Sequence, residues 1–340
     1  MTEAFLFFGA SIETTGDMLA RLQKTTTLLL IAVAVGWATW AVSAGRPELA
    51  WIGALAIVLG YSGILAIEFL LLWLSFPRSA IERPSMAQLI SCWLKECAIA
   101  PRVFLWRQPF RSHRHADLLA DARRGCRGIL LVHGFVCNRG LWNPWMKRLK
   151  AARIPFVAVN LEPVFGSIDG YAGIVDQAVT ALEEATGLPP VIVAHSMGGL
   201  AVRAWIARGN ERRFDRVVTV ASPHHGTRMA RRGFSDNTRQ MGIRDQWLES
   251  LRRREDPSIY RRFTCFWSHC DNIVFPTANA TLPQADNRHL AGTPHVQMVF
   301  HPAVIEEVLR LVTDTWPPLN RSASATPRSE PDAKPHRPTG

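Results

Sequence analysis

Charged residues are missing from residues 25–44 of this 340-residue chain, and Glu68 is the single charge between residues 49 and 76. Two runs of this kind argue against a wholly soluble protein. Each is long enough to cross the hydrocarbon core of a bilayer as a helix, which needs about 20 apolar residues. The connector Gly45-Arg46-Pro47-Glu48 is short and breaks helices. We therefore expect a transmembrane hairpin over residues 25–76 (spans 25–44 and 49–76), preceded by an N-terminal segment, residues 1–24.

A cleaved signal peptide is the alternative interpretation of the first run, because Val42-Ser43-Ala44 resembles a cleavage site. The acidic residues Glu3, Glu13 and Asp17 make residues 1–24 a poor positively charged leader, so an uncleaved span is favoured. Positive charges flank the outer ends of the two runs at Arg21, Lys24, Arg78, Arg83 and Lys95, whereas the connector has only Arg46. The positive-inside rule then places both ends of the hairpin in the cytoplasm.

No C-x-x-C pair occurs among the six cysteines, and the absence of ordered ligand spacing argues against a zinc site. The cysteines are Cys92, Cys97, Cys126, Cys137, Cys265 and Cys270. An even number permits disulfides if the domain is exported, whereas a domain facing the cytoplasm keeps its thiols. Topology and redox state are therefore linked.

Basic residues outnumber acidic ones by 39 to 28, and much of the excess is arginine between Glu211 and Arg262. A nucleic-acid surface is one explanation of such a charge. Since no nucleic-acid-binding fold is recognised, we expect instead that a basic face meets anionic lipid headgroups. Glu68 inside the second run is either a transport site or a side chain that reaches the membrane interface, and the lack of a charged partner favours the second.

Residues 77–127 are expected to hold an amphipathic helix and a linker. Ser85 can cap a helix whose apolar stripe begins at Met86 and ends at Cys97, with Pro101 beyond it. This helix either lies on the membrane or packs on the rest of the protein, and packing is favoured. Phe104 to His115 is expected to be a linker with apolar anchors.

From residue 128 to 314 the pattern alternates between short apolar strands and helices, which predicts an α/β domain with a parallel sheet covered on both faces. The predicted strands are 128–132, 156–161, 191–194, 217–221 and 263–267. The predicted helices are 174–185, 197–208 and 302–313. Residues 315–340 are rich in Pro, Ser and Arg and are expected to be a disordered tail.

The strand Val191-Ile192-Val193-Ala194 leads directly into His195-Ser196-Met197-Gly198-Gly199. This is the pattern of a nucleophile elbow, G-x-S-x-G, in which a strained turn presents a serine hydroxyl above the sheet. Ala194 replaces the first glycine and adds one methyl group. A serine that merely caps a helix is the alternative, so the remaining catalytic groups decide between the two.

A serine hydroxyl needs a base, and the base needs an orienting carboxylate. On such elbows the residues follow in the order Ser, Asp or Glu, His, each after a strand. Asp271 follows the strand 263–267, and His295 lies 24 residues further on, so we predict Ser196, Asp271 and His295 as the triad. The alternatives are His301, His224 and His225 as base and Asp215 and Asp286 as acid.

An acyl-transfer site also needs two backbone N–H groups aimed at the oxyanion. Met197, directly after the nucleophile, is expected to provide one. Phe135 in Val132-His133-Gly134-Phe135, after the first strand of the domain, is expected to provide the other. His133 is expected to brace this loop.

These motifs, together with Ser222-Pro223-His224-His225-Gly226-Thr227, resemble the α/β-hydrolase superfamily and within it the lipases. The resemblance covers residues 128–314, and the hairpin lies outside it. It implies an α/β-hydrolase fold with a cap-like insertion at residues 227–262. A helix over residues 243–254 of this insertion either covers an acyl pocket or packs on the core with a solvated basic face.

The prediction is a lipase or carboxylesterase that uses no metal or cofactor and faces the cytoplasm from a bacterial inner membrane. Its expected partners are a lipid or other acyl-ester substrate and the membrane, without nucleic acid. A thioesterase, amidase or acyltransferase would use the same residues. A catalytically silent binding module and a transporter are alternatives of other classes. The complete catalytic set argues against the first, and two spans with one unpaired Glu68 argue against the second.

Overall fold

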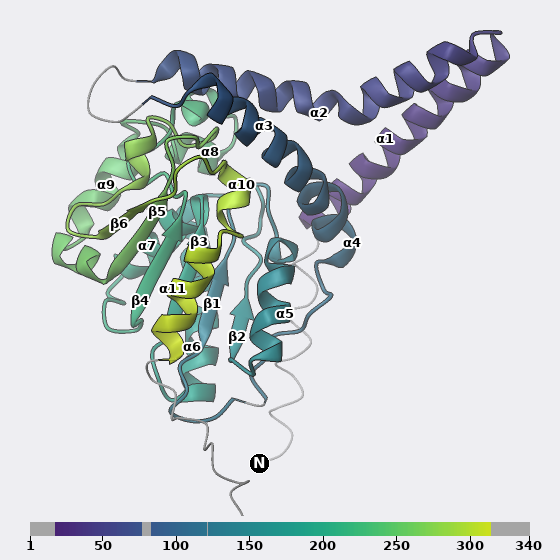
Figure 1. Ribbon diagram of the computed structural model, residues 1–340. Coiled ribbons are helices and arrows are strands. Elements are labelled where there is room, and N and C mark those ends of the chain that lie inside the picture. The colour runs from purple at the N-terminus through teal and green to yellow at the C-terminus, as the bar shows by residue number, and fades with distance from the viewer. Residues whose placement is uncertain (1–17, 77–82, 121, 314–340) are drawn as a thin grey trace, which may run out of the picture.

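The computed structural model of the chain describes residues 18–76, 83–120 and 122–313 (Figure 1). The first 17 residues of the predicted N-terminal segment and the tail predicted at residues 315–340 lie outside the described residues.

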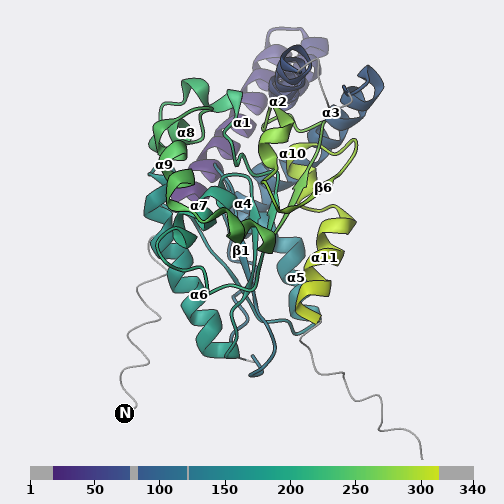
Figure 2. The same cartoon turned by 90° about the vertical axis from the view of Figure 1, so that its left-hand side faces the viewer.

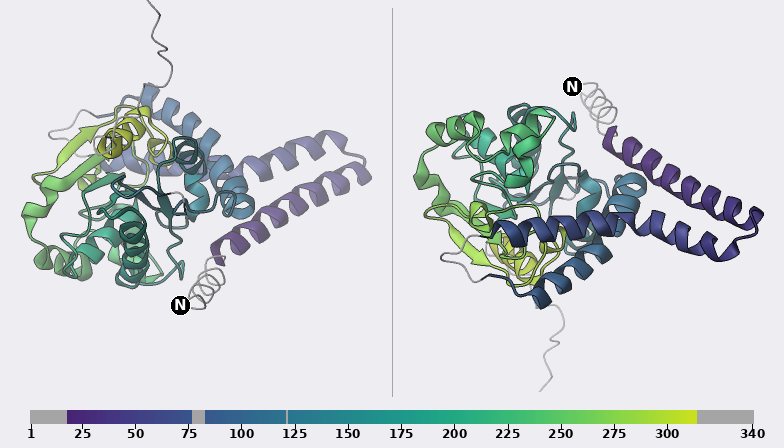
Figure 3. Two further views of the ribbon diagram at one scale, coloured as in Figure 1. Left: turned by 90° about the horizontal axis from the view of Figure 1, so that it is seen from below. Right: turned by 90° about the horizontal axis from the view of Figure 1, so that it is seen from above.

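Two long helices form the predicted hairpin, α1 (Met18–Ser43) and α2 (Pro47–Ser75). Both are long and apolar enough to cross a membrane by length and composition. The hairpin projects from the body of the protein, and the second half of α2 returns across it (Figures 1 and 3). Large apolar side chains on the projecting part are exposed, including Leu29, Ile31, Trp40, Trp51, Ile52 and Leu55. A large exposed apolar surface of this kind is typical of a site that contacts a membrane or another protein.

Helix α3 (Met86–Ala100) begins as the sequence predicts, because Ser85 and Gln88 form a capping box. Its predicted apolar stripe divides between two environments. Leu89 is buried, together with Cys92, which the predicted stripe does not include, whereas Met86, Ile90 and Leu94 are exposed. Helix α3 therefore packs on the body and also presents an apolar edge.

The expectation of a linker from Phe104 to His115 is wrong for most of this segment. A π-helix, η1 (Pro101–Arg107), and a short helix, α4 (Gln108–Arg111), continue directly from α3. Pro101 ends the α-helical hydrogen-bonding pattern because it has no N–H, but its φ of −62° is helical. The chain consequently continues as a helix with a wider turn.

The core of the α/β domain is a parallel six-stranded sheet in the order β2-β1-β3-β4-β5-β6. The strands are β1 (Ile129–Val132), β2 (Phe156–Ala158), β3 (Val191–His195), β4 (Arg216–Val220), β5 (Phe263–Trp267) and β6 (Asp286–His289). All strand residues of β1, β2 and β3 are buried, as their apolar runs require. Edge strand β6 has only polar residues, so no apolar pattern predicts it.

Helices cover both faces of the sheet (Figure 2). On one face α6 (Ala172–Thr186) and α7 (Met197–Ile206) pack on Leu130, Val132 and Ile192. On the other, α5 (Asn143–Ala151) and α11 (Pro302–Thr313) pack on Leu131 and Val193. Alternate residues of each strand thus enter opposite cores. The carboxyl ends of the strands meet at the edge over which α2 and α3 lie (Figure 1).

The insertion after β4 contains η4 (Arg228–Arg232), α8 (Asp236–Gln240), α9 (Gln246–Arg254) and η5 (Pro257–Arg262). Helix α9 begins three residues later than predicted, because the Asp245 side chain accepts a hydrogen bond from the N–H of Trp247. Leu248 and Leu251 enter the domain core. Of the two alternatives for this helix, the structure therefore agrees with the one in which α9 packs on the core.

Candidate functional site

Ser196 occupies a strained turn between β3 and α7. Its φ of 52° and ψ of −127° lie in a region that non-glycine residues seldom adopt. The surroundings hold the turn in place, since the Ser196 N–H donates to the carbonyl oxygen of Val220 at 2.9 Å. This is the backbone conformation expected of the predicted elbow.

The two glycines after the elbow allow close packing. A Cβ on Gly198 would lie 2.6 Å from the carbonyl oxygen of His133, and one on Gly199 would lie 2.3 Å from the Ser222 Oγ. Ala194, by contrast, is fully buried in the apolar core, where its methyl group packs. The first glycine of the usual pattern is therefore dispensable here, and the last is not.

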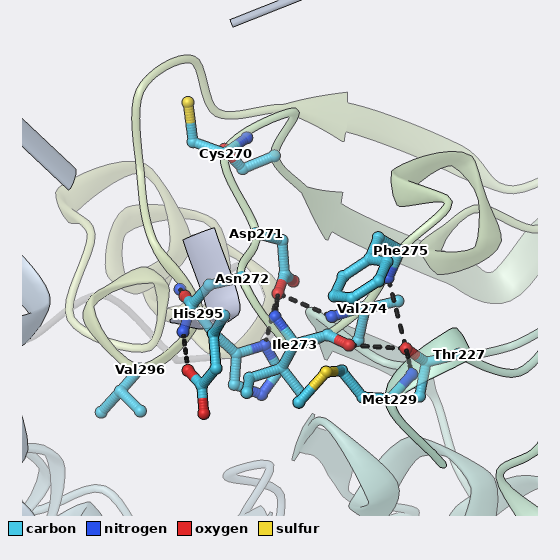
Figure 4. Close-up of polar contacts among 12 residues, drawn as sticks. Thr227, Met229, Cys270, Asp271, Asn272, Ile273, Val274, Phe275, His295 and Val296 are labelled. Atoms are coloured by element: carbon cyan, nitrogen blue, oxygen red, sulfur yellow. Dashed lines mark hydrogen bonds and ion pairs between the residues drawn. The ribbon is translucent and has the colours of Figure 1, made fainter. Parts of the chain in front are cut away.

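Asp271 and His295 form a buried pair at the carboxyl edge of the sheet (Figure 4). The His295 Nδ1 lies 2.9 Å from the Asp271 Oδ1, and the side chains are 6% and 2% exposed. The same carboxylate oxygen accepts hydrogen bonds from the N–H groups of Ile273 and Val274, both at 2.9 Å. These bonds fix the carboxylate toward the imidazole, which is the arrangement of an orienting acid and its base.

The electrostatics of His295 favour proton uptake. Burial alone would lower its pKa, but Asp271 outweighs burial, and Glu96 and Glu68 add to its effect, so the pKa of His295 lies above the ordinary value of 6.5. His195, whose ring centroid is 4.8 Å away, has its pKa held well below that value by burial. His195 therefore stays neutral beside His295.

One apolar cavity of about 390 Å³ brings the predicted groups together. Ser196, His295 and Phe135 line it, and Asp271 lies behind His295. A Cβ on Gly134 would lie 2.7 Å from the Ser196 Cβ, so the loop that carries Phe135 approaches the serine closely. Met197 follows Ser196 as the first residue of α7. An acyl-transfer site needs a serine hydroxyl, an oriented imidazole and two backbone N–H groups, and these residues are the candidates for those parts.

His133 braces the loop as expected. Its Nδ1 lies 2.8 Å from the Gly134 carbonyl oxygen, and its Nε2 accepts a hydrogen bond from the N–H of Leu161 at 2.9 Å. Burial lowers the pKa of His133 to about 4, which keeps the ring neutral. Both ring nitrogens are thus committed to the backbone.

The alternative bases have structural partners. His301 Nδ1 accepts a hydrogen bond from the N–H of Ala303 at the start of α11. His224 is fully buried against Thr219 and Cys265, whereas the neighbouring His225 is half-buried and its backbone N–H donates to the Asn279 carbonyl oxygen. The alternative acids are also engaged elsewhere, Asp215 with Arg127 and Asp286 with Arg288.

The cap insertion and the N-terminal helices also line the cavity. From the cap insertion come Met229 and Ala230 of η4 and Thr238 of α8, so these elements cover the cavity in place of α9. From the N-terminal helices come Leu65 and Glu68 of α2 and Glu96 of α3. Glu68 therefore faces the α/β domain, where it accepts a hydrogen bond from Asn272 at 2.7 Å, and the expectation that it reaches the interface is wrong.

Glu96 is not among the residues predicted from the sequence, although the pattern of residues around it on α3 could have identified it. It shares a helix face with Leu89, Cys92 and Ala100, all buried, at spacings of three and four residues. A carboxylate on a buried face needs partners, because an unpaired buried charge is costly. The position of Glu96 therefore indicates that its carboxylate binds specific polar groups of the protein.

Comparisons with known proteins agree with this fold. The model of the Alpha/beta hydrolase family matches residues 129–329. A lipase from Bacillus licheniformis in mature form is 16% identical, with a TM-score of 0.49, over 55% of this chain and 92% of the lipase. Lipase B of Aspergillus fumigatus is 19% identical, with a TM-score of 0.48, over 53% of this chain and 51% of the lipase. No curated protein sequence matches the chain.

Proposed function

Because this chain belongs to the alpha/beta hydrolase family, we propose that it is a membrane-anchored serine hydrolase that cleaves carboxylic esters, as a lipase or carboxylesterase does. The observation that carries the proposal is the cavity that Ser196 and His295 share, with Asp271 bonded to the far side of the imidazole. Together these groups can activate a hydroxyl, stabilise the resulting imidazolium and return the proton.

In the proposed mechanism His295 removes the proton of Ser196 as the hydroxyl oxygen attacks the ester carbonyl carbon. The N–H groups of Phe135 and Met197 bind the oxyanion, and His295 then protonates the leaving alcohol. Water, deprotonated by His295, releases the acid from the acyl-enzyme and regenerates Ser196. Every step uses residues of this chain and water.

A fluorophosphonate probe tests the proposal, since it phosphonylates activated serines. We expect the full-length protein in detergent to be labelled, with the adduct on Ser196 in peptide mass spectra, and the Ser196→Ala protein to remain unlabelled. Ser258 is an exposed serine whose hydroxyl donates to Asp256, so Ser258→Ala is the matched control and should label normally. Equal labelling of the Ser196→Ala protein would refute the assignment.

Membrane anchoring is the second part of the proposal. The exposed apolar surface of the hairpin supports it, and the flanking charges Arg21, Lys24 and Arg83 favour a cytoplasmic catalytic domain in a bacterial inner membrane. A fluorescent protein fused after Gly340 should fluoresce in such cells. Alkaline phosphatase fused at the same point should be inactive, and an active fusion would contradict this orientation.

A basic groove beside the catalytic cavity supports anionic lipid headgroups as partners. The groove has a volume of about 740 Å³ and shares Thr227 and Ala230 with the catalytic cavity. Four arginines line it: Arg228, Arg231, Arg239 and Arg244. One guanidinium group can donate two hydrogen bonds to two oxygens of a phosphate. The groove therefore suits the phosphate of a lipid whose acyl chain occupies the cavity.

The position of Leu65 makes acyl-chain length a test of the substrate class. Leu65 lines the cavity from α2, whereas its neighbour Ile64 is 62% exposed on the outer face. Leu65→Trp should lower kcat/KM for a dodecanoate ester relative to a butanoate ester roughly 5- to 150-fold, the range expected when a packed site is overfilled.

Ile64→Trp is the matched control for this experiment and should leave the ratio of the two kcat/KM values unchanged. Both variants should hydrolyse the butanoate ester, which keeps the test independent of folding. An unchanged ratio for Leu65→Trp would mean that the acyl chain does not bind against α2.

A further inference from the structure

Glu96 of α3 binds the backbone beside the proposed catalytic histidine. Its side chain is buried, with the residue 1% exposed. Its Oε1 accepts a hydrogen bond from the N–H of Val296 at 2.8 Å, and its Oε2 accepts one from Gln297 at 3.3 Å. Both donors belong to the short helix α10 (His295–Met298), which begins with His295. Glu96 thus fixes the segment from which the imidazole extends.

Glu68 of α2 reaches the same histidine through one intermediary. Its Oε2 accepts a hydrogen bond from the Asn272 Nδ2 at 2.7 Å, and the Asn272 Oδ1 accepts one from the His295 N–H at 3.2 Å. Asn272 is buried directly after Asp271. The contact therefore holds the acid loop and the base segment against each other.

Apolar packing makes these polar contacts rigid. Three elements form a single buried cluster: α2, α3 and the loop around Asp271. Its members are Phe69, Leu72, Leu89, Cys92, Cys270 and Phe275. A second contact joins α2 to α3, since the Tyr61 hydroxyl donates to the Cys97 carbonyl oxygen at 2.8 Å. The carboxylates of Glu68 and Glu96 are consequently held at fixed positions relative to the loops.

We propose that Glu96 and Glu68 are positioning residues for His295, so that the N-terminal helices complete the catalytic site as well as anchoring it. The inference rests on the proposed function. A displacement of about 1 Å in a reacting group can reduce a rate about 100-fold, so two charge-assisted contacts on the loops matter for catalysis. A hydrolase domain without these helices would keep the triad residues and lose their support.

Electrostatics provide a readout that a purely structural role would not affect. The groups facing His295 are the carboxyl groups of Asp271, Glu96 and Glu68 and the neutral ring of His195. Burial raises the pKa of Glu96 itself to about 7, so above that pH its charge adds to the field that holds the pKa of His295 high. Removing this charge must lower the pKa of His295. Since the base must be neutral in the free enzyme, the acid-side midpoint of kcat/KM against pH then moves to lower pH.

The test is Glu96→Gln in the full-length protein in lipid nanodiscs, assayed with a soluble butanoate ester. The amide replaces one of the two accepting oxygens by an N–H₂ donor, which then faces the N–H of either Val296 or Gln297 and cannot accept from it. We expect kcat to fall about 10- to 100-fold, the loss that is typical when a residue that orients a metal-binding side chain in an enzyme is replaced. KM should change less than twofold, and the acid-side midpoint should move to lower pH. Glu48→Gln, at an exposed site in the first turn of α2, is the matched control and should match the wild type.

Glu68→Gln is the second variant, because it keeps an acceptor for Asn272 and removes only the charge. A shift of its midpoint in the same direction, with a smaller loss of kcat, supports the inference even if Glu96→Gln does not fold. The inference is overturned if the acid-side midpoint does not move in either variant. If Glu96→Gln does not fold, an unmoved midpoint in Glu68→Gln alone overturns the inference. A wild-type protein that resists the fluorophosphonate probe contradicts the proposed function instead, so the two failures can be told apart.

Discussion

Replacing Asp271 by asparagine should lower kcat for ester hydrolysis about 10⁴-fold, the effect known for the orienting aspartate of serine proteases. The Asp271 Oδ1 accepts from the His295 Nδ1 and from two backbone N–H groups. Asparagine matches the size of aspartate but presents an amide N–H₂ or an uncharged oxygen, so it neither selects the correct tautomer nor stabilises the imidazolium. The measurement is kcat on a soluble ester together with the melting temperature.

The control for this variant is Asp286→Asn. Asp286 is exposed at the start of β6, where it pairs with Arg288 at 2.7 Å, and the substitution should leave kcat within twofold of the wild type. A kcat for Asp271→Asn within tenfold of the wild type would show that another group orients His295.

Glu255→Ala should reduce the free energy of unfolding by about 3–5 kcal/mol, the usual result of leaving a buried charge without its partner. The Arg203 and Glu255 side chains are 0% and 1% exposed and are joined at 2.6 Å. Burial works against the charged form of Arg203, but the bonds to Glu255 outweigh it and hold the pKa of the guanidinium above its ordinary value. Without Glu255 the guanidinium keeps only the His224 carbonyl oxygen and the Tyr260 hydroxyl. Denaturant unfolding in detergent, followed by tryptophan fluorescence, measures the loss.

Glu249→Ala provides the comparison within the same insertion. Glu249 pairs with Arg252 at 3.5 Å, and both side chains are about half exposed. Exposed pairs contribute roughly 0.2–1 kcal/mol, so the loss should be several times smaller than for Glu255→Ala. Equal losses would mean that the buried pair has no special part in joining α7 to the insertion.

The sheet and the elbow could be predicted from the sequence because local residues determine them. The run Val191–Ala194 is apolar at every position, as a central parallel strand requires, and Gly198 and Gly199 follow it where the backbone approaches its neighbours. Chain order then selects Asp271 and His295, which the structure places in contact. Their catalytic roles remain predictions.

Features that depend on tertiary contacts could not be predicted in this way. Strand β6 has no apolar residue among Asp286–His289 and exists because β5 offers it a partner. The π-helix that begins at Pro101 packs Val103 into the core of the α/β domain, a contact between segments far apart in the sequence. The contact of Glu68 cannot be predicted, because nothing in the sequence near it identifies Asn272, 204 positions further along, as its partner.

The two sides of α2 lead to a consequence for sequence variation. Toward the domain, Tyr61 and Glu68 each make a hydrogen bond. On the same side, Leu65 lines the cavity and Leu72 belongs to the buried cluster with α3. On the adjacent outer face, roughly 100° around the helix, Ile64, Ile67, Leu71 and Leu74 are exposed and need only be apolar. Random mutagenesis of this helix should therefore tolerate any aliphatic residue at the second set and very few residues at the first, in a pattern that repeats with each helical turn. A membrane anchor alone would show no such periodicity.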